Sequence, residues 1–223
     1  HYSTASDTQL SYPGGIWSDE GDTYHIADQP DLHYDAAIMD GQNVNNANLI
    51  TTRSLEFDGS DDYVNCGDID EMDGAAALTV SFWMKVSDTS LLHTPFAKRA
   101  DDSNRINIAT YSDYLYFVLT QGGTTYGQVA FTDLDWAHIV MVFDGAGSGN
   151  TERLKVYING SEVTLSYTGT IGATTPDTSA NLLFGVYGTT YMDGKLDEVA
   201  IWNIAMPSSD VTAIYNEGVP NIL

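Results

Sequence analysis

Residues Ser54–Asp68, SLEFDGSDDYVNCGD, place five carboxylates in a stretch of fifteen residues. Such a run fits three structures: a set of catalytic acids, the rim of a calcium site, or a polar turn between two strands. Gly59 stands inside the run, and a glycine at that place favours a turn that interrupts strand alternation. Each of the three structures predicts a different protein.

The composition narrows the fold and the partners. The 223 residues suit a single all-β sandwich, and 43% hydrophobic content is enough for a packed core. The formal charge of −23, from 31 acids and 8 bases, weighs against nucleic acids, anionic membranes and polyanionic polysaccharides as partners. Neutral glycans, protein surfaces and cations remain, and an acidic surface also suits a salty, marine medium.

Covalent and membrane features are sparse. Cys66 is the single cysteine, so an intrachain disulfide is excluded and a small buried residue is expected there. No run approaches the ~20 apolar residues of a membrane span, so no membrane insertion is expected. The chain starts HYSTASDTQL, without Met or an apolar leader, which predicts a processed chain or a piece of a larger protein.

Short alternating segments dominate from Asp31 onward. In ALTVSFWMKV, residues 77–86, one face carries Leu78, Val80, Phe82 and Met84 and the other carries Thr79, Ser81, Trp83 and Lys85. Further strands are predicted at RINIAT, YLYFVLT, TYGQVAF, WAHIVMVF, RLKVYI, EVTLSY, NLLFGVY and KLDEVAIW. This pattern predicts a two-sheet antiparallel jelly roll over residues 31–223, preceded by an irregular N-terminal arm over residues 1–30.

Two local signals are stronger than the rest. Asn159-Gly160 supplies the pair with positive φ that a two-residue hairpin needs between alternating strands. Only the C-terminal end looks helical: PSSDVTAIYNEG has a Ser208 or Ser209 cap, an apolar face with Val211, and Gly218 as terminator.

Three blocks together resemble the laminin G-like, concanavalin A-like lectin/glucanase superfamily. They are SLEFDGSDDYVNCGD with LTVSFWMKV, DWAHIVMVFDGAGSGNTERLKVYINGSEV, and NLLFGVYGTTYMDGKLDEVAIWNIAMPSSDVTAIYNEGVP. The resemblance covers roughly residues 31–220 and implies a jelly roll that serves as a carbohydrate-binding or adhesion module in extracellular, cell-surface or virion proteins. Because one fold hosts many activities, function follows only by analogy.

The resemblance leaves three functions open. The favoured one is a non-enzymatic, lectin-like module that binds neutral glycan or a protein surface and is stabilised by calcium. The second is a structural or interaction domain of a phage virion or large adhesin, in which residues 1–30 dock to a neighbouring domain. The third, a glycoside hydrolase, is disfavoured, because Glu56 and Asp58 have the two-residue spacing of the catalytic strand but no third carboxylate follows Gly59.

Calcium binding explains the acids in FDGSDD better than catalysis does. A hard cation takes six to eight oxygens from carboxylates and from carbonyls that a glycine turn can direct inward. The resemblance suggests that Asp197 in KLDEV lies beside this turn and supplies a carboxylate. The expected ligands are Asp197, Gly59 and Asp61, with Asp58, Asp62 and Asp35 as further candidates. The alternative is that these acids cap backbone N–H groups.

Sugar recognition requires aromatic planes for the apolar faces of the rings, with polar side chains around them for the hydroxyls. Tyrosines in or beside predicted loops, and one tryptophan on the outward face of its strand, meet the first requirement. The candidates are Tyr111, Tyr114, Tyr126, Tyr187, Tyr191 and Trp83. Ordinary packing is the alternative for each of them.

Overall fold

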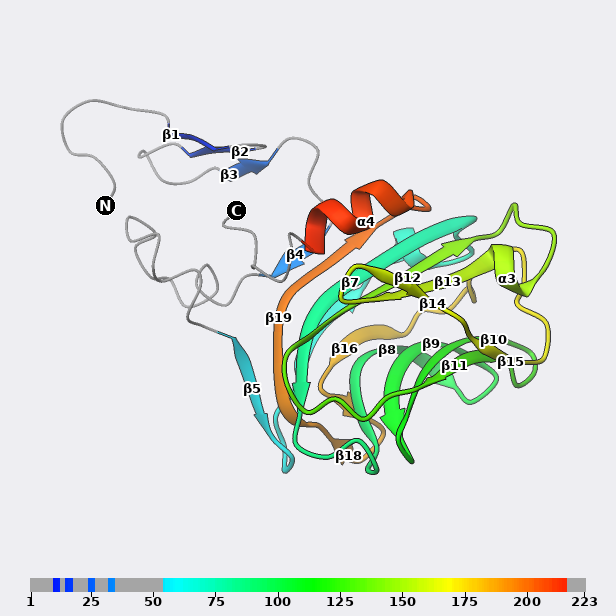
Figure 1. Cartoon of the computed structure of the whole chain (residues 1–223), viewed down its shortest axis with the longest axis horizontal. Helices are drawn as coiled ribbons and strands as arrows, with labels where there is room; N and C mark the ends of the chain where they lie inside the picture. Colours follow the sequence, from blue (N-terminus) through cyan, green and yellow to red (C-terminus); the bar gives the residue numbers. More distant parts are fainter. Residues whose placement is uncertain (1–9, 13–14, 18–23, 27–31, 35–53, 216–223) are drawn as a thin grey trace.

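The computed structural model describes residues 10–12, 15–17, 24–26, 32–34 and 54–215. Two large antiparallel sheets face each other, as the sequence predicts (Figure 1). We call one the open sheet; its strands are, in order, β15 (Ser166–Thr168), β11 (Tyr126–Ala130), β10 (Tyr114–Gln121), β9 (Asn104–Tyr111), β8 (His93–Asp101), β16 (Asn181–Phe184) and β6 (Val64–Asp68).

We call the other the covered sheet. Its strands are, in order, β14 (Ser161–Val163), β13 (Leu154–Ile158), β12 (Ala137–Asp144), β7 (Ala77–Val86), β19 (Asp193–Trp202) and β4 (Leu32–Tyr34), and β5 (Leu55–Asp58) also pairs with β19. The acidic turn after Asp58 therefore carries the chain from the covered sheet to β6 of the open sheet.

Smaller elements complete the described chain. Strands β1 (Leu10–Tyr12), β2 (Gly15–Trp17) and β3 (Tyr24–Ile26) form an antiparallel sheet inside the segment predicted to be irregular, and β17 (Val186–Tyr187) forms a hairpin with β18 (Thr190–Tyr191). The helices are η1 (Asp70–Met72), α3 (Asn150–Arg153) and α4 (Ser208–Tyr215). The sequence predicts α4 but not the single turn of α3. None of the described helices is long and apolar enough to span a membrane.

The core lies between the two sheets and follows the predicted alternation. Phe82 of β7 and Ile139 of β12 extend from the covered sheet, while Ile108 of β9 and Phe117 of β10 extend from the open sheet. All four are essentially inaccessible to solvent. Burying such side chains is the main favourable term in folding, so it fixes which face of each strand points inward.

The outer face of the covered sheet is also buried. Thr79 Oγ1 donates to the Ile204 carbonyl at 2.7 Å and accepts from the Met206 amide at 3.0 Å, which fastens the C-terminal segment across β7. Val211 of α4 packs there with Val140 and other outward residues of β12. Of the polar face predicted for β7, Thr79, Ser81 and Trp83 are therefore buried, whereas Lys85 at its end stays partly exposed.

Two predicted strands are interrupted. EVTLSY splits into β14, which pairs with β13, and β15, which pairs with β11 of the other sheet, so the chain changes sheets within this segment. NLLFGVY splits at Gly185, which has φ +81° and lies against the Phe57 ring. The predicted hairpin is confirmed: Asn159 and Gly160 have φ of 51° and 74°, and Ile158 pairs with Ser161.

Candidate functional site

The open sheet carries a cleft on its outer face, which we call the tyrosine cleft. Its volume is about 330 Å³, and it is lined by Leu92, Thr94, Arg105, Asn107, Ala109, Tyr111, Tyr116, Val118, Thr124, Tyr126 and Tyr187. The residues from β9 and β10 alternate with core residues, so the period of two that builds the core also directs Asn107 and Tyr116 outward.

Aromatic rings form much of the wall of the tyrosine cleft. The Tyr116 and Tyr126 rings meet edge to face, with centroids 5.5 Å apart and an interplanar angle of 65°. Tyr114 extends the row, at 6.3 Å from Tyr116 and 39% exposed. Burial and the neighbouring tyrosines raise the pKa of Tyr116, so its hydroxyl stays protonated and can donate a hydrogen bond.

Polar atoms in the cleft wall lack partners. Thr94 Oγ1, Asn107 Oδ1 and Arg105 Nε are buried and have no hydrogen-bond partner within the described part of the chain. Thr94 and Asn107 are 2% and 5% exposed. Because a buried polar group without a partner costs roughly 1–3 kcal/mol, these atoms mark a place where a bound molecule or water completes the wall.

A charged cluster stands beside the tyrosine cleft. Asp102 Oδ1 accepts from Arg105 Nη1 at 2.6 Å, from Arg99 Nη2 at 3.1 Å and from the Tyr187 hydroxyl at 2.9 Å. The Tyr187 hydroxyl also contacts Arg105, and its ring centroid lies 4.8 Å from the Arg99 guanidinium. The hydrogen bonds from Tyr187 and Arg99 lower the pKa of Asp102. This cluster fixes the β17–β18 hairpin to the ends of β8 and β9.

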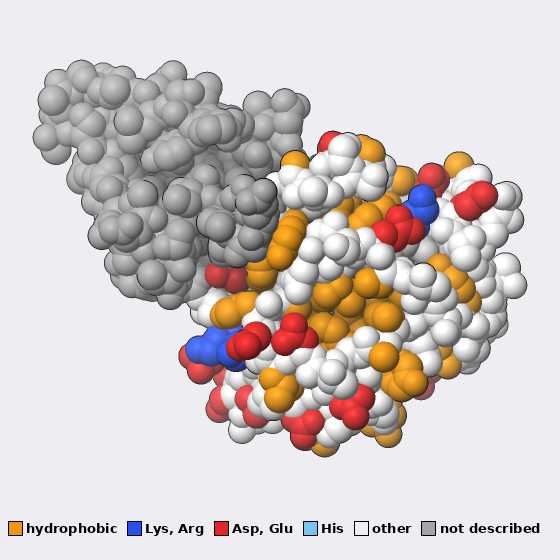
Figure 2. Space-filling view, viewed as in Figure 1, with side chains coloured by type: hydrophobic (Ala, Val, Ile, Leu, Met, Phe, Trp, Pro, Cys, Tyr) orange, Lys and Arg blue, Asp and Glu red, His pale blue; other side chains and the backbone are white. Residues whose placement is uncertain are grey.

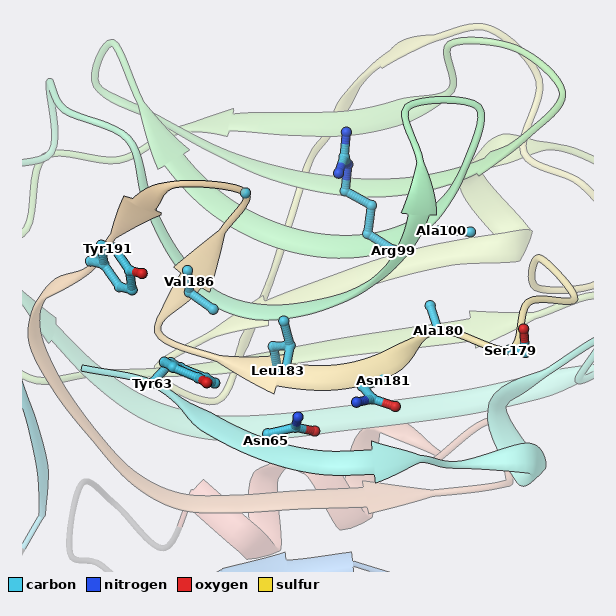
Figure 3. A pocket seen from close by; sticks show the side chains of 11 residues that line it. Tyr63, Asn65, Arg99, Ala100, Ser179, Ala180, Asn181, Leu183, Val186 and Tyr191 are labelled. Atoms are coloured by element: carbon cyan, nitrogen blue, oxygen red, sulfur yellow. The ribbon is translucent and has the colours of Figure 1, made fainter. Parts of the chain in front are cut away.

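A second, larger cavity lies on the other side of this hairpin, and we call it the asparagine cleft (Figure 3). Its volume is about 710 Å³, and it is lined by Tyr63, Asn65, Arg99, Ala100, Ser179, Ala180, Asn181, Leu183, Val186, Gly188 and Tyr191. Asn65 and Asn181 lie on the neighbouring strands β6 and β16, while Val186 and Tyr191 come from the hairpin at one end (Figure 3).

The charge of the lining differs from that of the chain. One arginine lines each cleft, Arg105 in the tyrosine cleft and Arg99 in the asparagine cleft, and the described lining residues include no Asp or Glu. Acidic side chains are instead spread over the described surface seen in Figure 2. Both clefts are therefore less negative than their surroundings.

The structure brings most of the predicted aromatic candidates together. Tyr111, Tyr126 and Tyr187 line the tyrosine cleft, Tyr191 lines the asparagine cleft, and Tyr114 stands at the edge of the aromatic row. The sequence alone does not show that they converge on one face.

Trp83 requires a correction. It lies on the outward face of its strand but is only 6% exposed, because it is covered by the Tyr215 ring of α4 at 5.9 Å and by His138 at 5.1 Å. It belongs to the covered sheet and offers no open plane to a sugar.

The sequence prediction missed Tyr116, Asn107, Arg105 and Thr94 in one cleft and Tyr63, Asn65 and Asn181 in the other. A signal was present for some of them. In RINIAT, Arg105 and Asn107 alternate with the core residues Ile106 and Ile108, and Tyr116 alternates in the same way with Leu115 and Phe117.

The turn after β5 gathers part of the predicted metal site. Asp58, Asp61 and Asp62 each place a carboxylate oxygen within 4.8 Å of the others. Asp58 Oδ1 also accepts from the Ser60 amide at 2.8 Å, and Asp62 Oδ2 from the Asp58 amide at 3.1 Å. The donor set fits a hard cation, because each carboxylate can accept from the backbone and still offer oxygen lone pairs to a metal.

Asp197 does not lie with these acids, which corrects the predicted ligand shell. On β19 the residue opposite Asp58 is Asp193, and Gly59 donates its amide to the Met192 carbonyl. Asp197 lies four positions further along β19, about 13 Å from Asp193 at the rise of a strand. Its carboxylate accepts from the Glu198 amide at 2.9 Å, beside a bulge in the pairing with β7. Asp35 lies outside the described residues.

A second acidic group has a different use. Asp68, Asp70 and Asp73 also approach one another, but Lys98 contacts Asp68 and binds Asp73 at 3.1 Å. Lys98 is 2% exposed and also donates to two carbonyls, so it is a buried cation that these acids neutralise.

The carboxylates with the spacing of a catalytic pair lie outside both clefts. Glu56 and Asp58 lie on β5, which pairs with the covered sheet, and Glu56 binds Lys195 of β19 at 3.2 Å. Neither residue lines the tyrosine cleft or the asparagine cleft.

The chain is similar in sequence to one protein family and in fold to several solved structures. The family model described as concanavalin A-like lectin/glucanases superfamily matches residues 58–212. No curated protein matches the chain. Among solved structures, the receptor-binding domain of botulinum neurotoxin C/D mosaic serotype is similar, with TM-score 0.57 and 15% identity over 74% of this chain and 42% of that one.

Two further solved structures are similar. A heptameric SAP-like pentraxin from Limulus polyphemus has TM-score 0.52 and 16% identity over 73% of this chain and 81% of its own. The binding domain of botulinum neurotoxin DC in complex with SialylT has TM-score 0.53 and 16% identity over 74% and 44%. The chain spans less than half the length of the neurotoxin domains, and at these identities the likeness concerns the fold.

Proposed function

The chain belongs to the concanavalin A-like lectin/glucanases superfamily, and we propose that it is a non-enzymatic module that binds neutral carbohydrate in the tyrosine cleft. The observation that carries this proposal is the pairing of Tyr116 and Tyr126 with the unpartnered atoms of Asn107 and Thr94 in one cleft. Tyrosine rings pack against the C–H faces of sugars, and amide and hydroxyl groups bond to their hydroxyls.

A binding role also agrees with where the acids lie. Hydrolysis of a glycosidic bond needs two carboxyl groups on opposite sides of that bond, about 5–10 Å apart. Glu56, the leading candidate, is instead paired with Lys195 along the covered sheet. Two of the similar structures are neurotoxin binding domains, and this is compatible with a binding role here.

We include calcium in the proposal as a stabiliser rather than as part of the carbohydrate site. Asp58, Asp61 and Asp62 would hold it, with the Gly59 carbonyl as a further oxygen. The turn joins β5 to β6 and so links the two sheets. An ion bound there would stabilise the edge of the sandwich. We expect such a module to act outside the cell, on a cell surface or on a virion, beside neighbouring domains.

A glycan array of neutral oligosaccharides, followed by calorimetry on any sugar that binds, tests the carbohydrate site. Tyr116→Ala and Asn107→Ala should each weaken binding about tenfold or more, because each removes a buried contact. Trp136→Ala is the matched control, since Trp136 is 37% exposed and lies outside the lining of both clefts. Absence of binding to every neutral sugar, or equal binding by all three variants, would refute the proposal.

A further inference from the structure

Two arginines face each other beside the clefts. Arg99 of β8 and Arg105 of β9 are directly opposite in the strand pairing. Like charges at such positions are destabilising unless a counter-charge lies between them. The Asp102 carboxylate takes this place and accepts from both guanidinium groups.

The ion-paired cluster holds two guanidinium groups and one carboxylate, so it carries a net positive charge. Among the described residues, Asp102 is the acidic partner of both arginines, and the two guanidinium charges exceed it by one. The Nε atoms of Arg99 and Arg105 also lack partners in the described part of the chain. Asp101 is the chain neighbour of Asp102, but its carboxylate accepts from the Ser103 amide and the Asn104 side chain rather than from either arginine.

The asparagine cleft gives a ligand access to this charge. Arg99 lines the cleft across from Asn65 and Asn181, and its side chain extends away from these two residues along the wall (Figure 3). Tyr63, which is 53% exposed, and Tyr191 supply aromatic surface, and the small side chains of Ala100 and Ala180 leave space. Tyr187, which contacts both arginines, lines the tyrosine cleft, so the two clefts lie on either side of one cluster.

We propose that the asparagine cleft is a second subsite that binds an acidic substituent, a carboxylate or a sulfate, on a sugar neighbouring the one in the tyrosine cleft. Arg99 is the group that binds the acid. The sugar part rests on the proposed function, whereas the anion part rests on the arginine cluster alone. A planar guanidinium suits both acids, since it donates two parallel hydrogen bonds to carboxylate or sulfate oxygens.

The first experiment uses simple anions. Sodium acetate and sodium sulfate are titrated separately into the ¹⁵N-labelled protein at constant ionic strength, and the arginine Nε–Hε signals are followed by NMR. The Arg99 signal should shift and saturate. The Arg153 signal should not, because its Nε already donates to the Gly147 carbonyl at 2.7 Å. A response to only one anion would identify the acid class.

The second experiment compares glycans that share one neutral core and differ in a single carboxylate or sulfate. The acidic member should bind about tenfold more tightly, as expected for a charge-assisted pair. Arg99→Gln should reduce this difference to about twofold or less, and Arg99→Lys should restore part of it. Lys85→Gln, which removes the same charge from the covered sheet, should leave the difference intact. Thermal melts confirm that each variant is folded.

The outcomes separate the two proposals. Equal or weaker binding of the acidic glycans by the wild type refutes the second subsite and leaves the neutral site standing. A saturable Arg99 shift without any bound neutral sugar supports the anion subsite and refutes the proposed function. No anion response and no preference for acidic glycans refute the subsite outright.

Discussion

Asp58 on β5 lies directly opposite Asp193 on β19, and the acidic turn begins at that pair. Asp197, which the resemblance suggests as the carboxylate beside this turn, is displaced from the pair by four residues of strand. Antiparallel pairing fixes this displacement, because each residue of β5 has a single partner on β19. The β19 carboxylate nearest the turn is therefore that of Asp193, and Asp197 is too far along the strand to join Asp58, Asp61 and Asp62.

Calcium should raise the melting temperature relative to protein with a chelator. An ion that binds only the folded state stabilises it by about 2.7 kcal/mol at a hundredfold excess over its Kd. Asp61→Asn should abolish the calcium-dependent shift, while Asp197→Asn should retain it, because Asp197 lies outside the cluster. An unchanged melting temperature in the wild type, measured by calorimetry, would argue against a site at this turn.

Lys98→Met should lower the free energy of unfolding by about 3 kcal/mol, because Asp68 and Asp73 would lose a buried counter-charge. Lys85→Met is the control. Lys85 and Asp135 form an exposed pair at 3.1 Å, and its loss should cost under about 1 kcal/mol. Urea denaturation measures both. Similar losses for the two variants would show that Lys98 is not a structural centre.

Gly185→Ala should destabilise the fold by about 3 kcal/mol. A Cβ atom there would lie 2.3 Å from the Phe57 ring, and the backbone has φ +81°. Gly188→Ala separates these two effects, since φ is +63° but nothing lies within 4 Å of the added atom. It should cost about 1 kcal/mol of backbone strain. If chemical denaturation gives the same loss of stability for both variants, contact with Phe57 is not what requires a glycine at position 185.

His138 should make stability depend on pH. Its Nε2 lies 2.8 Å from Ser81 Oγ, and burial lowers its pKa from 6.5 to about 4. As pH falls below 6.5 the unfolded chain takes up the proton first, so stability is lost progressively until about pH 4. The loss through this residue should be about 3 kcal/mol.

The contribution of His138 is isolated by comparing urea denaturation of the wild type and His138→Gln from pH 7 to pH 4. The wild type should lose more stability over this range than the variant, which has no group that titrates at this position. Parallel stability curves for the two proteins would contradict the assignment.

The sequence identified several elements because their signals are local. Asn159-Gly160 predicts its hairpin from the φ angles that these residues tolerate, and Ser208–Tyr215 predicts its helix from a cap and an apolar stripe. The alternation in residues 77–86 predicts which side chains of β7 enter the core. It does not predict that the opposite face is buried, because the cover comes from Met206 and Val211, more than a hundred residues away.

The candidate site could be predicted from the sequence less well than the hairpin, the helix and the strands, because it depends on the tertiary structure. The tyrosines were recognisable individually as possible contacts for a sugar, whereas their convergence on one cleft required the order of the strands in the open sheet. The exclusion of Trp83 required the position of Tyr215. The pairing of Arg99 with Arg105 required the alignment of β8 with β9, which follows from the turn between them and its irregularities.

The sequence by itself determined the strand periodicity, the hairpin, the closing helix and the membership of a jelly-roll family, since each depends on neighbours in the chain. The tertiary structure alone decided which sheet is covered, where the clefts lie, and that Asp193 rather than Asp197 faces the acidic turn. These features depend on pairing between strands distant in sequence. That pairing is fixed when the whole core packs, because a shift by one residue would turn buried side chains outward.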